Sequence, residues 1–246
     1  SRIFTIKSLS QPKVVDMEIT IHPPKYTNAT IKKVENNGDI IIAEGSNIKW
    51  RIQLQNTTNS SIVFDNKVEK KSTTNSLNFQ KKIYTNATYS IISSNENNLT
   101  DSLTYYIKVI PDEFPQILLE QEYDSSNQQY IFNGTIEDDY KLRRLEFIYS
   151  YTLNDSLITT TTELNIQGLN VEHFFHTFSF EKLNIKAGEE LNYRFKVWDN
   201  DGVNGSKFTK TKTFIYKEPS TEDLIKKKDI ENDITKSGIN KSISLA

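Results

Sequence analysis

The sequence predicts an all-β chain of two tandem β-sandwiches followed by a short C-terminal helix. Its 246 residues include 11% aromatic residues, and the apolar set is mainly Ile, Leu, Val, Phe and Tyr, with a single Met. This mixture favours strands over helices. Apolar and polar residues alternate in short runs. Turn signals recur about every 8–12 residues, which is the spacing of a sandwich rather than of alternating strands and helices.

The first sandwich is expected over residues 14–112, after an N-terminal segment of residues 1–13. Residues 48–54 alternate most clearly, with Trp50 at the centre of the inward-facing set. A strand with a central inward Trp is typical of an immunoglobulin-like sandwich, which carries this residue in its third strand. The strands expected in this half are residues 14–21, 40–43, 48–54, 61–64, 76–81, 87–93 and 105–110.

The second sandwich is expected over residues 113–218. Residues 111–115 hold two prolines separated by acidic residues, a composition that suits a linker between domains. Beyond them the period-two alternation starts again. The strands expected in this half are residues 116–121, 130–136, 142–152, 157–166, 173–180, 191–198 and 207–216.

Residues 219–246 are expected to form a helical or disordered tail. Ser220 or Thr221 can cap the first turn of a helix, and the acidic residues that follow suit the positive end of its dipole. Gly238 is expected to end the helix.

An internal echo relates the two halves. Residues 103–109 read LTYYIKV and residues 191–197 read LNYRFKV, so the same pattern returns after 88 residues, about the length of one sandwich domain. Tyr105 and Tyr193 occupy the same place in this pattern. A Tyr early in the penultimate strand predicts a tyrosine corner, in which the hydroxyl bonds to a nearby backbone group.

Composition and motifs indicate that the chain is not an enzyme. The net charge is −2, with 30 basic and 32 acidic residues well mixed, so nucleic acid is not an expected partner. Without cysteine there is no disulfide, thiol nucleophile or Cys-ligated zinc. His173 and His176 should point to opposite faces of a strand, which does not suit a zinc site. A hydrolase is kept as an alternative, for which activity lost on Asp199→Ala would be the evidence.

Four acidic residues form the candidate metal site. Asp138 and Asp139 lie between the second and third strands expected in the second sandwich, and Asp199 and Asp201 lie between its last two. In an immunoglobulin-like sandwich these two loops emerge at the same end. Converging carboxylates repel unless they are neutralised, and calcium, which takes about six to eight oxygen ligands, is the candidate cofactor. The alternative is turn chemistry, in which Asp side chains accept bonds from nearby backbone N–H groups. Three basic side chains could also neutralise the carboxylates: Lys141, Arg143 and Arg144.

A glycan-binding face is a further alternative, because sugars bind to exposed aromatic rings. Most of these residues are better explained as the core and cross-strand pairs of the sheets. The candidates are Tyr140, Tyr149, Tyr151, Phe174 and Phe175.

Several motifs resemble those of a family of large Bacteroidetes membrane-anchored envelope proteins, a domain-of-unknown-function family. They are the run YRFKVWDNDGVNGSK at residues 193–207, PSTED at 219–223, EDDYKL at 137–142, P-x-Y at 24–26 and EG-x-x-I-x-W at 44–50. The resemblance covers residues 15–225. It departs from the family after Tyr140, where Lys141 stands in place of a frequent Gly.

The resemblance implies a β-rich region between N-terminal transmembrane helices and a long helical region, on the periplasmic or extracytoplasmic side of a bacterial membrane. It implies no activity. We also expect the chain to be a piece of a longer protein, since Ser1 opens what reads as the middle of a strand. The expected function is a non-catalytic structural or interaction module. Its expected partner is an envelope protein, and the membrane is expected to be reached only through segments outside this chain.

Overall fold

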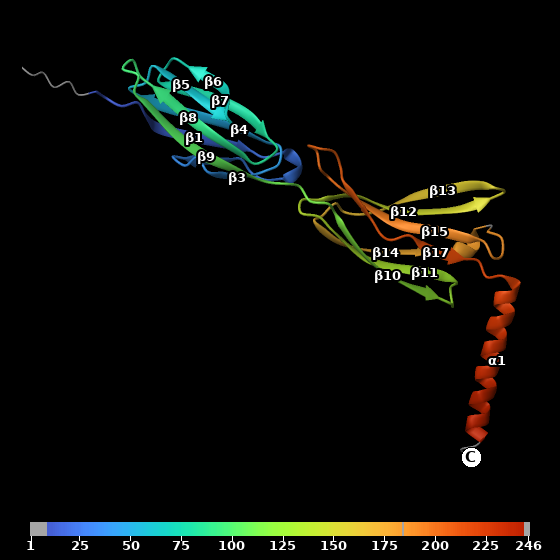
Figure 1. Ribbon diagram of the computed structural model, residues 1–246. Helices are drawn as coiled ribbons and strands as arrows, with labels where there is room; N and C mark the ends of the chain where they lie inside the picture. The colour runs from blue at the N-terminus through green and yellow to red at the C-terminus, as the bar shows by residue number, and fades with distance from the viewer. Residues whose placement is uncertain (1–8, 184, 244–246) are drawn as a thin grey trace, which may run out of the picture. The chain divides into compact units, whose positions relative to one another are not determined.

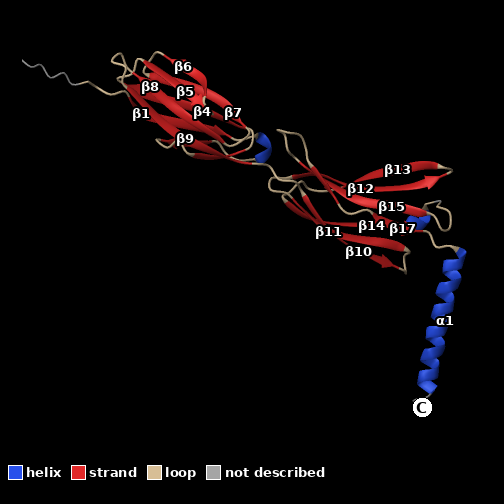
Figure 2. Cartoon of the chain, viewed as in Figure 1, coloured by secondary structure: helices blue, strands red, loops and turns tan. Residues whose placement is uncertain are grey.

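The computed structural model describes residues 9–183 and 185–243. These residues form 17 strands, two short 3-10 helices (Lys25–Thr27 and Phe180–Lys182) and one α-helix (Figures 1 and 2). The chain divides into two compact units. The first extends to Glu113 and includes the segment Asn200–Ser206, and the second comprises Phe114–Asp199 and the chain from Lys207 onward. Each unit is built around an immunoglobulin-like sandwich, which confirms the predicted fold class.

The first sandwich packs a four-stranded sheet against a five-stranded one. The strand orders are β2-β1-β4-β7 and β3-β9-β8-β5-β6, and every pair is antiparallel except β3 with β9. The bounds are β1 Lys13–His22, β2 Lys32–Glu35, β3 Ile40–Ala43, β4 Ser46–Gln55, β5 Asn59–Phe64, β6 Lys67–Ser72, β7 Ser76–Ile83, β8 Ala87–Ser94 and β9 Thr100–Ile110.

Trp50 is the centre of the first core. Alternation along β4 buries Ile48, Trp50 and Ile52 almost completely, between 0% and 1% exposed. The Trp50 ring lies 5.5 Å from the rings of both Phe64 and Tyr89, which come from the opposite sheet. The expectation that this Trp marks the third strand is wrong. Its strand β4 pairs with β1, whereas the third strand of an immunoglobulin-like sandwich lies in the opposite sheet.

The second sandwich packs β10-β11-β14 against β13-β12-β15-β16, and β17 also pairs with β15. Three Phe rings from both sheets meet at its centre: Phe132 lies 5.7 Å from Phe147 and 5.2 Å from Phe195. The bounds are β10 Gln116–Asp124, β11 Gln129–Glu137, β12 Leu142–Leu153, β13 Ser156–Leu164, β14 Val171–Phe178, β15 Glu190–Asp199, β16 Phe208–Lys210 and β17 Phe214–Lys217.

The internal echo does not join equivalent strands. β9, which carries Tyr105, is the last strand of its sandwich. β15, which carries Tyr193, pairs with β12 on one side and with the last two strands, β16 and β17, on the other. The strand equivalent to β15 is β8, and Tyr89 takes the place of Tyr193.

Tyr193 does not form the predicted tyrosine corner, because its hydroxyl donates to Gln121 Oε1 at 2.9 Å, 72 residues away. The Tyr89 hydroxyl donates to the carbonyl of Gly38 at 2.8 Å, 51 residues away. Tyr105 covers Gly38 instead: a Cβ at position 38 would lie 2.2 Å from the Tyr105 ring, so this close approach requires Gly.

The C-terminal helix α1 spans Thr221–Ile243. Ser220 caps it: its Oγ accepts a bond from the Asp223 N–H at 3.1 Å, and Asp223 Oδ2 accepts a bond from the Ser220 N–H at 3.1 Å. The prediction that Gly238 ends the helix is wrong. A Gly inside a helix costs only about 1 kcal/mol, and here the helix continues past it. No described helix is long and apolar enough to cross a membrane. The outer parts of the predicted end segments, residues 1–8 and 244–246, lie outside the described residues.

We predict that Tyr89→Phe lowers the free energy of unfolding of the first sandwich by about 1 kcal/mol, because the Gly38 carbonyl then loses its buried donor. Chemical denaturation measures the loss. Tyr106→Phe is the matched control, since Tyr106 lies on the neighbouring strand β9 with 47% of its surface exposed. Equal stability of the two variants would contradict the importance of this bond.

Candidate functional site

The two acidic loops leave the second sandwich at the same end, as predicted. Asp138 and Asp139 follow β11 directly, and Asp199 is the last residue of β15. In the ladder between β12 and β15, Leu142 pairs with Asp199, so the turn before β12 and the loop after β15 meet at one edge.

Asp138 is held in a tight turn. Its Oδ2 accepts bonds from the backbone N–H groups of Tyr140 at 3.1 Å and Lys141 at 3.0 Å. Its Oδ1 is buried and has no hydrogen-bond partner among the described residues. Asp138 as a whole is 9% exposed. Burial raises the pKa of this carboxyl to about 6, and the nearby charges of Asp139 and Asp199 add to the effect. The Asp138 carboxyl is therefore costly to ionise in the folded chain.

Asp199 is neutralised by Lys207. The Asp199 side chain is fully buried; Oδ1 accepts the Lys207 backbone N–H at 2.7 Å, and Oδ2 lies 2.9 Å from Lys207 Nζ. Lys207 was not among the cations expected from the sequence. The register of the hairpin explains this pairing: the Asp199 backbone N–H donates to the Lys207 carbonyl at 3.1 Å, so the two residues lie opposite each other. Of the expected cations, Arg144 pairs with Glu146 at 3.2 Å.

Asp201 also makes a turn, in the segment Asn200–Ser206 that is counted with the first unit. Its Oδ1 accepts the N–H groups of Val203 at 2.6 Å and Asn204 at 3.2 Å. In the same unit, Asn204 Nδ2 donates to Glu44 Oε1 at 2.7 Å. The structure therefore brings Asp138, Asp139 and Asp199 together in the second unit and describes Asp201 within the first.

Glu172 is a buried carboxylate that sequence reasoning missed. Its two oxygens accept the N–H groups of Gln167 and Leu169, both at 2.7 Å, and so order the loop before β14. The signal was the alternation of β14, which places Glu172 on the same inward face as Phe174. Within the described residues, no group of three or more His, Cys, Asp or Glu side chains is arranged to hold a metal ion.

Most of the aromatic residues considered for glycan binding belong to the core. Phe174 is 8% exposed and packs 5.4 Å from Phe195, while Tyr149 and Tyr151 pack against the same core. Tyr140 is half-buried at the acidic end. Phe175 is 65% exposed on the outer side of β14. The core explanation therefore holds for three of these five residues.

Sequence reasoning also missed a cluster around Trp198, on the outer face of the other sheet. Trp198 Nε1 donates to Glu146 Oε2 at 3.1 Å, and Arg144 Nε lies 3.2 Å from Glu146 Oε1. Phe208 of β16 packs 4.7 Å from the Trp198 ring. The signal was the alternation of β15, whose inward residues are Tyr193, Phe195 and Val197, so that Trp198 must face outward.

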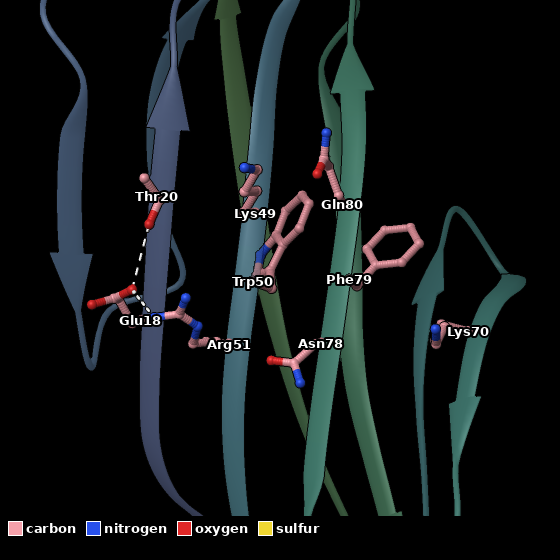
Figure 3. A pocket seen from close by; sticks show the side chains of 9 residues that line it. All are labelled: Glu18, Thr20, Lys49, Trp50, Arg51, Lys70, Asn78, Phe79 and Gln80. Atoms are coloured by element: carbon pink, nitrogen blue, oxygen red, sulfur yellow. Dashed lines mark hydrogen bonds and ion pairs between the residues drawn. The ribbon is translucent and has the colours of Figure 1, made fainter.

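A hollow of about 710 Å³ lies on the outer side of the first sandwich (Figure 3). Glu18 stands at its edge and pairs with Lys33 Nζ at 3.0 Å and Arg51 Nη1 at 3.3 Å. The bond from Lys33 holds the pKa of the Glu18 carboxyl below its usual range, with burial opposing. None of the nine residues that line the hollow is His, Ser, Asp or Cys, and all except Trp50 and Phe79 are polar or charged: Glu18, Thr20, Lys49, Trp50, Arg51, Lys70, Asn78, Phe79 and Gln80.

The two histidines of β14 point to opposite faces, as predicted. His173 is exposed and bonds through Nδ1 to Thr135 Oγ1 at 2.9 Å. His176 faces inward, 4.9 Å from the Phe147 ring, and burial lowers its pKa. The prediction that the chain is not an enzyme stays a prediction.

Comparison with known proteins gives no family. No family model matches the chain, and no curated protein matches it. A solved structure from a 1.5-MDa bacterial ice-binding adhesin, studied for host cell surface retention, covers 86% of this chain and 67% of its own at 12% identity, with a TM-score of 0.43. A chain from the complex of Dpr2 Ig1–Ig2 with DIP-Theta Ig1–Ig3 covers 82% of this chain and 93% of its own at 11% identity, with a TM-score of 0.25. The similarity is one of fold alone.

The calcium hypothesis is tested by thermal unfolding with millimolar calcium and with EDTA. Because backbone N–H groups and Lys207 already bond to the buried carboxylates, we expect the same melting temperature in both. A higher melting temperature in calcium, lost in Asp199→Asn, would contradict this and support a metal site.

We predict that Asp138→Asn stabilises the second sandwich at about pH 8 by about 1–3 kcal/mol. The Asp138 pKa is raised from its ordinary value of 3.8 to about 6, so the folded chain binds this proton more tightly than the unfolded chain does. Ionisation therefore costs stability as the pH rises from about 4 to about 6, and the cost remains above that window.

The measurement is denaturant unfolding of both proteins in EDTA at several pH values. An Asn at position 138 keeps an oxygen for the two backbone donors and removes the charge. The advantage of the variant should disappear at about pH 4, where Asp138 is protonated in the folded chain. A constant difference across this range would show that the charge is not responsible.

Proposed function

We propose that the chain is a non-catalytic structural and interaction module of a larger membrane-anchored protein, acting on the periplasmic or extracytoplasmic side of a bacterial envelope. The envelope location rests on the sequence resemblance. The binding role rests on one structural observation: large apolar side chains stand exposed together on the outer face of the sheet β10-β11-β14.

The exposed residues of this apolar face come from both edge strands of the sheet. Leu118 of β10 is 73% exposed, and Val171 and Phe175 of β14 are 52% and 65% exposed. Across β11, Leu118 lies level with His173, because Thr135 pairs with both, and Val171 and Phe175 stand on either side of His173 along β14. Several large exposed apolar side chains on one face of a folded domain favour binding to a partner.

A shallow hollow of about 380 Å³ opens in the apolar face over Gly134. A Cβ at this position would lie 2.4 Å from the Phe174 ring and 2.7 Å from the Leu118 carbonyl, so only Gly fits. The Phe174 ring occupies the inner side of Gly134, and the hollow lies over the bare backbone on the outer side, between Leu118 and His173, where a partner's apolar side chain would fit.

The charge around the apolar face is acidic. The three strands β10, β11 and β14 contain no Lys or Arg. Glu120, Glu122 and Glu137 alternate onto the same outward side as Leu118. The complementary partner is therefore a protein surface with an apolar centre and basic residues around it.

The test is cross-linking in envelope extracts with the wild type and with Leu118→Ser/Phe175→Ser. We expect a reproducible protein partner that is captured at least about tenfold less by the variant, since the anchoring side chains of the interface are gone. The matched control is Ile41→Ser/Ile215→Ser, which removes two side chains that are 63% and 62% exposed elsewhere.

The control should capture the partner as the wild type does, and all three proteins should melt at the same temperature. Equal capture by Leu118→Ser/Phe175→Ser, or the lack of any reproducible partner, would count against the proposed function.

A further inference from the structure

The outer face of β12, β15 and β16 gathers cations and aromatic rings, and we call it the cationic face. Ladder pairing sets Arg144 beside Trp198, Trp198 beside Phe208, and Lys196 beside Lys210. Because side chains alternate along each strand, the residues between them enter the core and these five share the outer side. Arg194 lies on the same side, two residues before Lys196.

Two aromatic rings hold these cations in place. Lys196 Nζ lies between them, 3.8 Å from the centroid of Trp198 and 4.0 Å from that of Phe208. The Arg144 guanidinium stacks 4.7 Å from Trp198, and Lys210 Nζ lies 5.2 Å from Phe208. Contacts of this kind orient cationic side chains without neutralising them, so the charges stay available to a ligand.

The carboxylates of the face do not balance its cations. Four cations, Arg144, Arg194, Lys196 and Lys210, share the outer side with three carboxylates: Glu146, its partner Glu163 on β13, and Glu190 at the start of β15. Both oxygens of Glu146 are already bonded, to Arg144 Nε and Trp198 Nε1.

The remaining cations repel one another. Burial lowers the pKa of Lys196, and the nearby charges of Lys210, Arg144 and Arg194 lower it further against the opposing effect of Glu146. An anion bound to this face would relieve the repulsion.

We propose that the cationic face binds an acidic polysaccharide, one that carries carboxylate or sulfate groups along a linear chain. The cations lie on three adjacent strands, which are spaced about 4.8 Å apart, so they form an open surface that a repeating polyanion can cross. Nucleic acid fits less well, because single strands bind by stacking bases on open ring faces, and here cations occupy the rings. This site shares no residue with the apolar face.

The test is binding of the whole chain to polygalacturonate by isothermal titration calorimetry. Lys196→Gln/Lys210→Gln should weaken binding at least about tenfold, and added salt should weaken the wild type, since each ion contact is screened. Lys71→Gln/Lys108→Gln is the control, because it removes the same charge from two exposed strand lysines of the first sandwich. It should bind like the wild type.

Lys196 is partly buried, so melting temperatures accompany every titration. If the double variant does not fold, Lys210→Glu alone, at an exposed position, carries the test and should also weaken binding at least about tenfold. Unchanged binding by a folded cationic-face variant would overturn the proposal. Equal loss in the control variant, equal binding of neutral dextran, or tighter binding of poly-dT than of polygalacturonate would do the same.

Discussion

The packing of aromatic rings between two sheets is the interaction on which the rest of this structure depends. With no cysteine in the chain, no disulfide can tie the sheets of either sandwich together. Trp50 and Tyr89 meet across the first core at 5.5 Å, and Phe132 and Phe195 across the second at 5.2 Å. Each such ring removes a large apolar area from water, so the cores fix which face of every strand points inward. The opposite faces, the loops and their chemistry follow from that choice.

Alternation made the fold predictable, and topology limited the prediction. Period-two patterning locates Trp50 in a buried strand, but it does not say which sheet that strand joins. The sequence echo paired Tyr105 with Tyr193 because their local patterns agree, while the hydrogen-bond ladders make Tyr89 the equivalent residue. Local pattern reports which side chains face the core. Strand order depends on contacts between distant segments, and a single sequence does not display those.

The acidic loops show the same limit at the level of single side chains. Their convergence could be predicted, since Asp138 and Asp199 follow from the loop order of the fold. The turn bonds of Asp138 and Asp201 are those of the turn-chemistry alternative. The partner of Asp199 could not be predicted, because it depends on local register: Lys207 reaches Asp199 across a hairpin. The cluster around Trp198 was missed for a related reason. An outward Trp is recognisable from alternation only when the inward residues of its strand are known.

The single parallel pairing described in the first sandwich has a mechanical consequence. β3 runs alongside the last strand β9 in the same direction, from Ile40 beside Ile107 to Ala43 beside Ile110. Tension that pulls β3 toward its N-terminal end and β9 toward its C-terminal end would load these hydrogen bonds in shear, so they would have to break together. In the second sandwich every described pairing is antiparallel. Among these pairings, the first strand β10 is not bonded to the last strand β17. Under a stretching force the two sandwiches would therefore yield unequally, with the second extending while the first still holds.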